Sequence, residues 1–248
     1  MALSGFAQRS TQSLIGLLAI IAILTFASST HATSMGIDLA FDPYGSTFAP
    51  GTYNAATMDE YLTEMHNDHL AWVRVWACEG LDGLSFDGSG NCTGINSGNL
   101  SNIVSFVSEA NSLGLTVELV FVNSSDIVDH PNFVENTANM NALIDNGLVP
   151  IGKAVEGYKA QFDLVNEGDY TTGTVGWGYL RNFLGAAKST LVADGVDRWV
   201  TMSIGFYSDI GDFTDTIGGL GFDFYEYHMY NDQGWCPERP PSAASPSS

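Results

Sequence analysis

An apolar run that stops abruptly at an amide and a carboxylate is the most informative feature for chemistry. Residues 162–168 read FDLVNEG, so the run ends at Asn166 and Glu167. Burial raises the pKa of a carboxyl group, which lets it hold a proton near neutral pH and donate it. We therefore expect Glu167 to act as a general acid. A glutamate that faces water at a strand end, or that caps the next helix, would give the same pattern.

A second candidate is Arg74, in the middle of the run Trp72–Trp76 (WVRVW). Strand alternation places Trp72, Arg74 and Trp76 on one face. A buried guanidinium requires an anionic partner, either in a structural ion pair or at a catalytic carboxylate that it keeps ionised. Trp76 is expected to stack on a sugar ring, unless it is ordinary core packing.

The last apolar run, 222–230 (FDFYEYHMY), places Glu226, His228 and Tyr230 on one face. A lone histidine is usually a core group. Because His228 is accompanied by Tyr230 at the end of the run, we expect both to belong to a binding or catalytic site.

These residues lie on a regular alternation of elements. Strands are expected to begin near residues 35, 72, 116, 161, 199 and 222, and helical periodicity falls between them, including one or two helices within 135–160. Helical crossovers require parallel strands. Six such units without a glycine-rich phosphate loop predict an incomplete TIM (β/α)8-type barrel, with active-site residues at the carboxyl ends of the strands. A doubly wound open sheet is the alternative that periodicity leaves open.

Composition narrows the choice of partner. The 248 residues carry 8 Lys+Arg against 28 Asp+Glu, a formal net charge of −20, and 45% are hydrophobic. Such acidity argues against nucleic acid and anionic lipid as partners, because both require basic side chains. A neutral ligand such as a carbohydrate remains compatible with it.

The ends of the chain differ from its centre. Arg9, the apolar run 14–24 and the small residues that follow predict a signal peptide over 1–32, and therefore a secreted or periplasmic protein that is free of the membrane after cleavage. Residues 33–234 form the expected barrel domain. Residues 235–248 are a Pro/Ser-rich tail.

Three cysteines are present. Cys78 and Cys92 flank a glycine-rich stretch and are candidates for a disulfide, while the odd count leaves at least one cysteine, such as Cys236, without an internal partner. The cysteines and histidines do not have zinc-ligand spacing, so we expect no structural metal.

Three motifs in order resemble a known family. VRVW with Arg74, LVNE ending at Glu167, and HMY beginning at His228 are similar to the clan A glycoside hydrolases, in particular the cellulase-like family 5, over about Met35 to Asn231. This resemblance implies a TIM barrel that hydrolyses β-linked poly- or oligosaccharides with retention and without a cofactor. It implies Glu167 as general acid/base, Asn166 as the ligand of the sugar 2-hydroxyl, and Arg74, His228 and Tyr230 as the supporting residues.

The second carboxylate of that mechanism is missing from the pattern. Retention requires a nucleophile whose carboxyl group lies about 5–5.5 Å from that of the acid, and in the family it ends the seventh strand. Here only residues 231–248 follow the sixth strand, Glu238 lies in a proline-rich stretch, and Glu226 belongs to the sixth strand itself. We therefore expect either a truncated glycosidase with weak or no activity, or a barrel remnant that binds carbohydrate without cleaving it.

Overall fold

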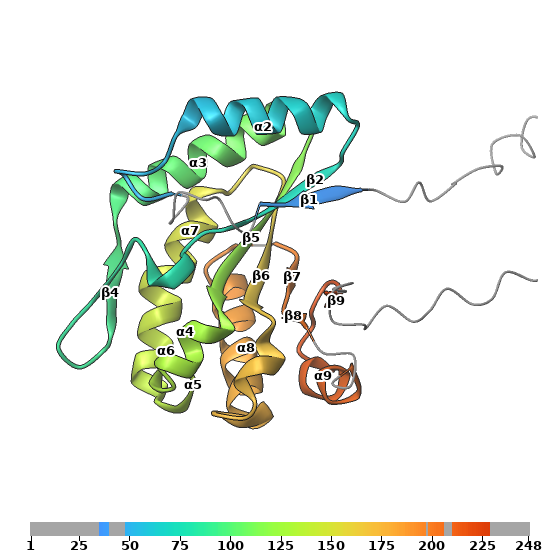
Figure 1. Cartoon of the computed structure of the whole chain (residues 1–248). Helices are drawn as coiled ribbons and strands as arrows, with labels where there is room; N and C mark the ends of the chain where they lie inside the picture. The colour runs from blue at the N-terminus through green and yellow to red at the C-terminus, as the bar shows by residue number, and fades with distance from the viewer. Residues whose placement is uncertain (1–34, 40–47, 197, 206–209, 229–248) are drawn as a thin grey trace, which may run out of the picture. The chain divides into compact units, whose positions relative to one another are not determined.

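The computed structural model describes residues 35–39, 48–196, 198–205 and 210–228. The main sheet is parallel throughout (Figure 1). Its strands, in spatial order, are β1 (Gly36–Asp38), β2 (Trp72–Trp76), β5 (Thr116–Asn123), β6 (Ala160–Asn166) and β7 (Val200–Thr201). A second parallel pair joins β8 (Ser203–Ile204) to β9 (Glu226–Tyr227). Only Met202 separates β7 from β8, so one segment pairs first with β6 and then with β9. Six barrel strands thus follow one another in chain order, and the predicted fold, an incomplete TIM-type barrel, is confirmed.

Helices connect these strands and pack in the same sequence. Along the chain, α2 contacts α3, α3 contacts α7, α7 contacts α8, and α8 contacts α9. Within the described ranges, no helix combines the length and the apolar character that a membrane span requires. The helices are α2 (Ala55–Asn67), α3 (Ser97–Ser112), α4 (Ser124–Asp129), α5 (Asn132–Glu135), α6 (Thr137–Leu143), α7 (Val149–Ala154), α8 (Gly176–Ala193) and α9 (Ile210–Ile217).

Helix α3 illustrates how the sequence determines these elements. Asn96 caps its amino end by accepting a hydrogen bond from the backbone N–H of Gly98, 2.8 Å. Ile103, Phe106, Val107 and Ala110 recur at helical spacing and are completely buried. Each large apolar side chain of this kind contributes roughly 1.5–3 kcal/mol on burial. The helix stops before Gly114, whose φ of +87° suits the reversal into β5.

The helical region expected within 135–160 is irregular but not interrupted. Helix α6 runs into the π-helical turn η2 (Ile144–Leu148), and α7 follows directly, beginning next to Pro150. Gly147 lies in that turn, where an added Cβ would come within 3.2 Å of the Phe121 ring. Glycine at this position therefore allows the turn to lie close to β5.

A hairpin that the sequence did not predict occupies part of the glycine-rich stretch. Strands β3 (Leu84–Phe86) and β4 (Cys92–Ile95) pair antiparallel. The Asp87 carboxylate closes the turn by accepting hydrogen bonds from the backbone of Ser89 and Asn91. The residues of this hairpin alternate too weakly between apolar and polar side chains for the sequence to predict two strands.

The two described cysteines are free thiols. Cys78 and Cys92 are both buried, and no disulfide joins them, although their spacing had made them candidates for one. Burial raises the pKa of each thiol. We therefore expect both thiols to react slowly in the folded protein. Cys236 lies outside the described residues.

Candidate active site

Arg74 is the centre of the polar interior. It lies on β2 with 1% of its surface exposed. Its guanidinium donates to Glu118 on β5 (2.9 Å) and to Asp163 on β6 (2.5 Å), and its Nη1 lies 3.2 Å from a carboxylate oxygen of Asp38 on β1. It also lies 3.3 Å from Glu226 on β9. The anionic partner that a buried arginine requires is therefore a set of four carboxylates, contributed by four different strands.

The charges in this cluster are not independent. Burial opposes the charge of Arg74, but the carboxylates around it outweigh that effect and raise its pKa. Burial also raises the pKa of Glu118 well above its usual value, and the negative charges of Glu226 and Asp163 raise it further. Arg74 opposes this shift, and the two oxygens of Glu118 accept hydrogen bonds from Arg74 Nε (2.9 Å) and Gln161 Nε2 (2.5 Å).

His228 links this cluster to Glu167. Its Nδ1 lies 2.8 Å from Glu167 Oε1, and its Nε2 lies 3.2 Å from Glu226 Oε1. Burial would lower the pKa of His228, but the hydrogen bonds to Glu167 and Glu226 outweigh it and raise the pKa to about 9. We therefore expect the imidazole to be protonated at neutral pH and to donate from both nitrogens. The side chains of Glu226 and His228 lie on the same side of the chain, as strand alternation predicts.

Glu167 adopts an unusual backbone conformation. It follows the last residue of β6 and lies in the left-handed region, with φ 49° and ψ 51°. A residue with a Cβ pays on the order of 1 kcal/mol or more for this conformation, and such residues persist only where the surroundings enforce them. The turn η3 (Gly168–Thr171) follows directly, and the Tyr170 N–H donates to the Glu167 carbonyl, 3.0 Å. Glu167 is thus turned out of the strand direction towards His228.

Asn166 connects Arg74 with the neighbouring strand. Its carbonyl oxygen accepts from Arg74 Nη2, 2.9 Å, and its amide donates to Asn123 at the end of β5, 3.1 Å. Asn123 also accepts from the indole N–H of Trp76, 2.9 Å. The side chains of Arg74, Trp76, Asn166, Glu167 and His228 are therefore joined by hydrogen bonds and by the Arg74–Glu226 ion pair, directly or through Asn123 or Glu226.

Trp76 packs against Arg74. The Arg74 guanidinium lies 4.6 Å from the centre of its ring, and only 5% of the residue is exposed. The cation occupies one face of the ring, so stacking on a sugar would need the other face. The expected role of Trp76 as a sugar platform stays a prediction. Tyr230, the remaining expected site residue, lies outside the described residues.

Glu226 is not placed to act opposite Glu167. Each carboxylate binds a different nitrogen of the His228 ring, so the imidazole stands between them. A retaining pair needs a sugar carbon in that space. Glu226 therefore holds His228 and Arg74, and the nucleophile of a retaining mechanism must be a different carboxylate.

Sequence reasoning did not identify all participants. Glu118 and Asp163 lie inside apolar runs, which is the signal that could have marked them as partners of Arg74. Ser203 carried no such signal, yet its hydroxyl accepts from the backbone N–H of Glu167, 2.9 Å.

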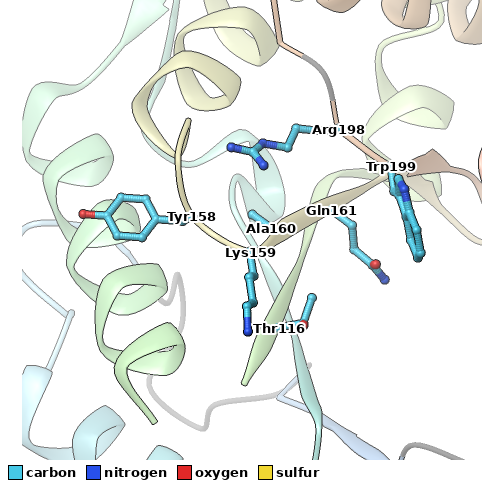
Figure 2. A pocket seen from close by; sticks show the side chains of 7 residues that line it. All are labelled: Thr116, Tyr158, Lys159, Ala160, Gln161, Arg198 and Trp199. Carbon is cyan, nitrogen blue, oxygen red and sulfur yellow. The ribbon is translucent and has the colours of Figure 1, made fainter. Parts of the chain in front are cut away.

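The structure also contains a hollow at the opposite end of the strands (Figure 2). It has a volume of about 350 Å³ and lies where β5 and β6 begin, away from Glu167. Among the described residues, its lining includes no carboxylate. Its lining residues are Thr116, Tyr158, Lys159, Ala160, Gln161, Arg198 and Trp199.

Comparisons with known proteins relate the chain to one fold. No family model and no curated protein matches the sequence. Among solved structures, the β-mannanase of the blue mussel Mytilus edulis matches 80% of this chain and 69% of its own, with a TM-score of 0.63 and 19% identity. The β-1,4-D-mannanase of Cryptopygus antarcticus matches 79% and 67%, with a TM-score of 0.64 and 21% identity. The β-1,4-mannanase of the sea hare Aplysia kurodai matches 79% and 71%, with a TM-score of 0.65 and 18% identity. At these identities the likeness concerns the fold, that of barrel glycoside hydrolases.

Proposed function

We propose that the chain derives from a glycoside hydrolase acting on a β-linked polysaccharide or oligosaccharide. One observation carries the proposal, namely that Glu167 is held against the His228 imidazole beside Asn166, at the carboxyl end of a barrel strand. In barrel enzymes this end of the strands carries the chemistry. Because the solved structures with this fold include proteins named β-mannanases, β-1,4-mannan is the first substrate to test.

In the proposed reaction Glu167 is the general acid/base. It would protonate the oxygen of the leaving sugar and later remove a proton from the attacking water. Asn166 would bind the 2-hydroxyl of the sugar, while Arg74, His228 and Tyr230 would support Glu167 and Asn166. No cofactor takes part.

We further propose that the chain as given hydrolyses glycans weakly or not at all. The retaining mechanism requires a nucleophile, and Glu226 is separated from Glu167 by the His228 ring. In the part of the chain that the structure describes, we assign no other carboxylate to that role. A small external anion can then take the place of the missing nucleophile.

Azide rescue is the direct test. With a 2,4-dinitrophenyl β-mannobioside, azide should attack the anomeric carbon while dinitrophenolate leaves without needing a proton, and the product should be the α-mannobiosyl azide. With mannooligosaccharides the leaving alcohol needs a proton, so azide-dependent turnover should also require Glu167. We expect Glu167→Gln to abolish only the second reaction, and the exposed Glu64→Gln to change neither. Absence of azide product from β-mannosides and β-glucosides alike would contradict the assignment.

The second candidate function is carbohydrate binding without cleavage. It is favoured by the position of His228, whose ring lies between the carboxylates of Glu167 and Glu226. Affinity electrophoresis in mannan or β-glucan gels would detect it. Retarded migration that persists in Glu167→Gln, with no azide product, would support this alternative over the hydrolase.

Export is also part of the proposal. Residues 1–32 are proposed as a signal peptide, which would place the mature protein outside the cytoplasm. The intact mass of protein recovered from the medium or periplasm tests this, because cleavage after Ala32 leaves Thr33 as the first residue. Recovery of the uncut chain in the membrane fraction would contradict it.

A further inference from the structure

We propose that Ser203 is the positioning residue that holds Glu167 in its left-handed conformation and so directs the Glu167 carboxylate to His228. The inference rests on the proposed function, because it concerns how the general acid/base is oriented. Ser203 lies on β8, is completely buried, and does not touch the reacting position itself.

The hydroxyl of Ser203 has all of its hydrogen-bonding capacity engaged. It donates to Asp163 Oδ2, 2.6 Å, and accepts from the Glu167 backbone N–H, 2.9 Å. It also lies 3.4 Å from Arg74 Nη2, which supplies the remaining donor. A serine hydroxyl has one proton and two lone pairs, so these three contacts fix its orientation.

The support of Ser203 is itself rigid. Its backbone N–H donates to the other oxygen of Asp163, 3.0 Å, and Asp163 is fully buried. Asp163 in turn binds Arg74. The position of the Glu167 amide is therefore set by a buried, charge-assisted chain that runs through Asp163 and Ser203.

Glu167 needs such an anchor because its backbone conformation is strained. A left-handed glutamate relaxes towards the extended or right-handed region unless its N–H and C=O are held. Its carbonyl accepts from Tyr170, and its N–H is bonded to Ser203. Without the hydroxyl, the amide loses the acceptor that fixes the turn, and the side chain is free to leave His228.

The test uses the ionisation of His228 as a reporter that does not depend on turnover. Glu167 and Glu226 bond its ring, and the charges of Arg74 and Asp38 also act in this cluster. In protein labelled with 13C-histidine, the His228 signal is assigned by its loss in His228→Gln and titrated by NMR. Glu167→Gln should lower the pKa of His228 by about one unit or more. Ser203→Ala should reproduce at least half of that shift.

Thr201→Val is the matched control. Thr201 is buried in the adjoining strand β7, and its hydroxyl bonds only to the backbone of Met202 and Phe224 among the contacts described. The variant removes a buried hydroxyl near Ser203 without touching Glu167, so it should leave the His228 titration unchanged. An unshifted titration in Ser203→Ala, beside a shifted one in Glu167→Gln, would overturn the proposal. So would an unshifted titration in Glu167→Gln.

A second measurement needs no substitution, which matters if Ser203→Ala fails to fold. Hydrogen exchange of the Glu167 amide in the unmodified chain should be slowed at least tenfold relative to an unprotected amide. Exchange at the unprotected rate would overturn the proposal. In the azide assay, Ser203→Ala should slow mannooligosaccharide cleavage but not release of dinitrophenol. If no azide product forms and the titration still shifts, the proposed function fails while the positioning role stands.

Discussion

Replacing Arg74 with methionine should destabilise the protein by about 3–5 kcal/mol, the usual cost of removing one partner from a buried charge network. The side chains of Glu118 and Asp163 are 4% and 0% exposed, so both would lose their cation inside the protein. Asp38 is 43% exposed and can turn to water, so it adds little. Against a total stability of about 5–15 kcal/mol for a domain, this loss is large.

Urea unfolding followed by tryptophan fluorescence would measure the effect. With a slope of about 2–3 kcal/mol per molar urea, the midpoint of Arg74→Met should fall by about 1–2.5 M. Lys153→Met is the control, because its partner Asp194 is 37% exposed and Lys153 is itself 49% exposed. That variant should lose less than about 1 kcal/mol.

The deficit of Arg74→Met should also depend on pH. Burial already raises the pKa of Asp163 and of Glu118, and removing the cation raises both further. The contribution of these two carboxyl groups to stability is then fully present below the ordinary carboxyl pKa and is lost as pH rises through their raised pKa values. The deficit should therefore be smaller at pH 4.5 than at pH 7.5. A loss at pH 7.5 no greater than that of Lys153→Met would refute the reasoning.

Three further outcomes follow from the described geometry. The pKa of His228 is raised to about 9, so the stability that its protonated ring contributes to the fold, about 3 kcal/mol at most, is present below pH 6.5 and is lost as pH rises through 9. His228→Gln should therefore flatten the decline of the urea midpoint between pH 7 and 10. Gly205→Ala would bring a Cβ within 2.6 Å of the Tyr170 ring and 3.1 Å of the Glu167 carboxyl carbon, so it should cost about 1–3 kcal/mol in thermal or urea unfolding. The Glu167 contact should also shift the His228 titration, and an unchanged titration would count against that contact. Cys78 and Cys92 should resist iodoacetamide in the folded protein and react after unfolding, as mass spectrometry would show; rapid labelling of the native chain would contradict their burial.

Much of the fold was predictable because its signals are local. The first five barrel strands begin close to where an apolar run begins, and α3 and α8 follow the apolar spacing of the sequence, whereas β9 begins only at Glu226 within the run expected from residue 222. The β3–β4 hairpin was not predictable, since its strands are three and four residues long and are held by an aspartate-centred turn. Periodicity reports burial, and this hairpin buries little.

The site was predictable only in part. The end of an apolar run identified Glu167, and the cost of burying a guanidinium implied carboxylates around Arg74. Which carboxylates these are depends on the register of β2, β5 and β6, and local patterns do not contain register. The sequence also did not predict the left-handed backbone conformation of Glu167. Gly168 is the natural candidate for a positive φ, yet Glu167 has it, and Gly168 is required because a Cβ there would lie 2.3 Å from the sulfur of Met202.

The arrangement around Arg74 has a consequence for how the chain folds. Its guanidinium contacts Asp38 on the first strand and Glu226 on the last, so its coordination is complete only when segments from opposite ends of the domain have met. Contacts between such distant segments carry a large loop-closure entropy and form slowly. During synthesis, β2 would therefore wait for β9 with one anion absent. Docking of β9 is then the step that completes the set of carboxylates around Arg74.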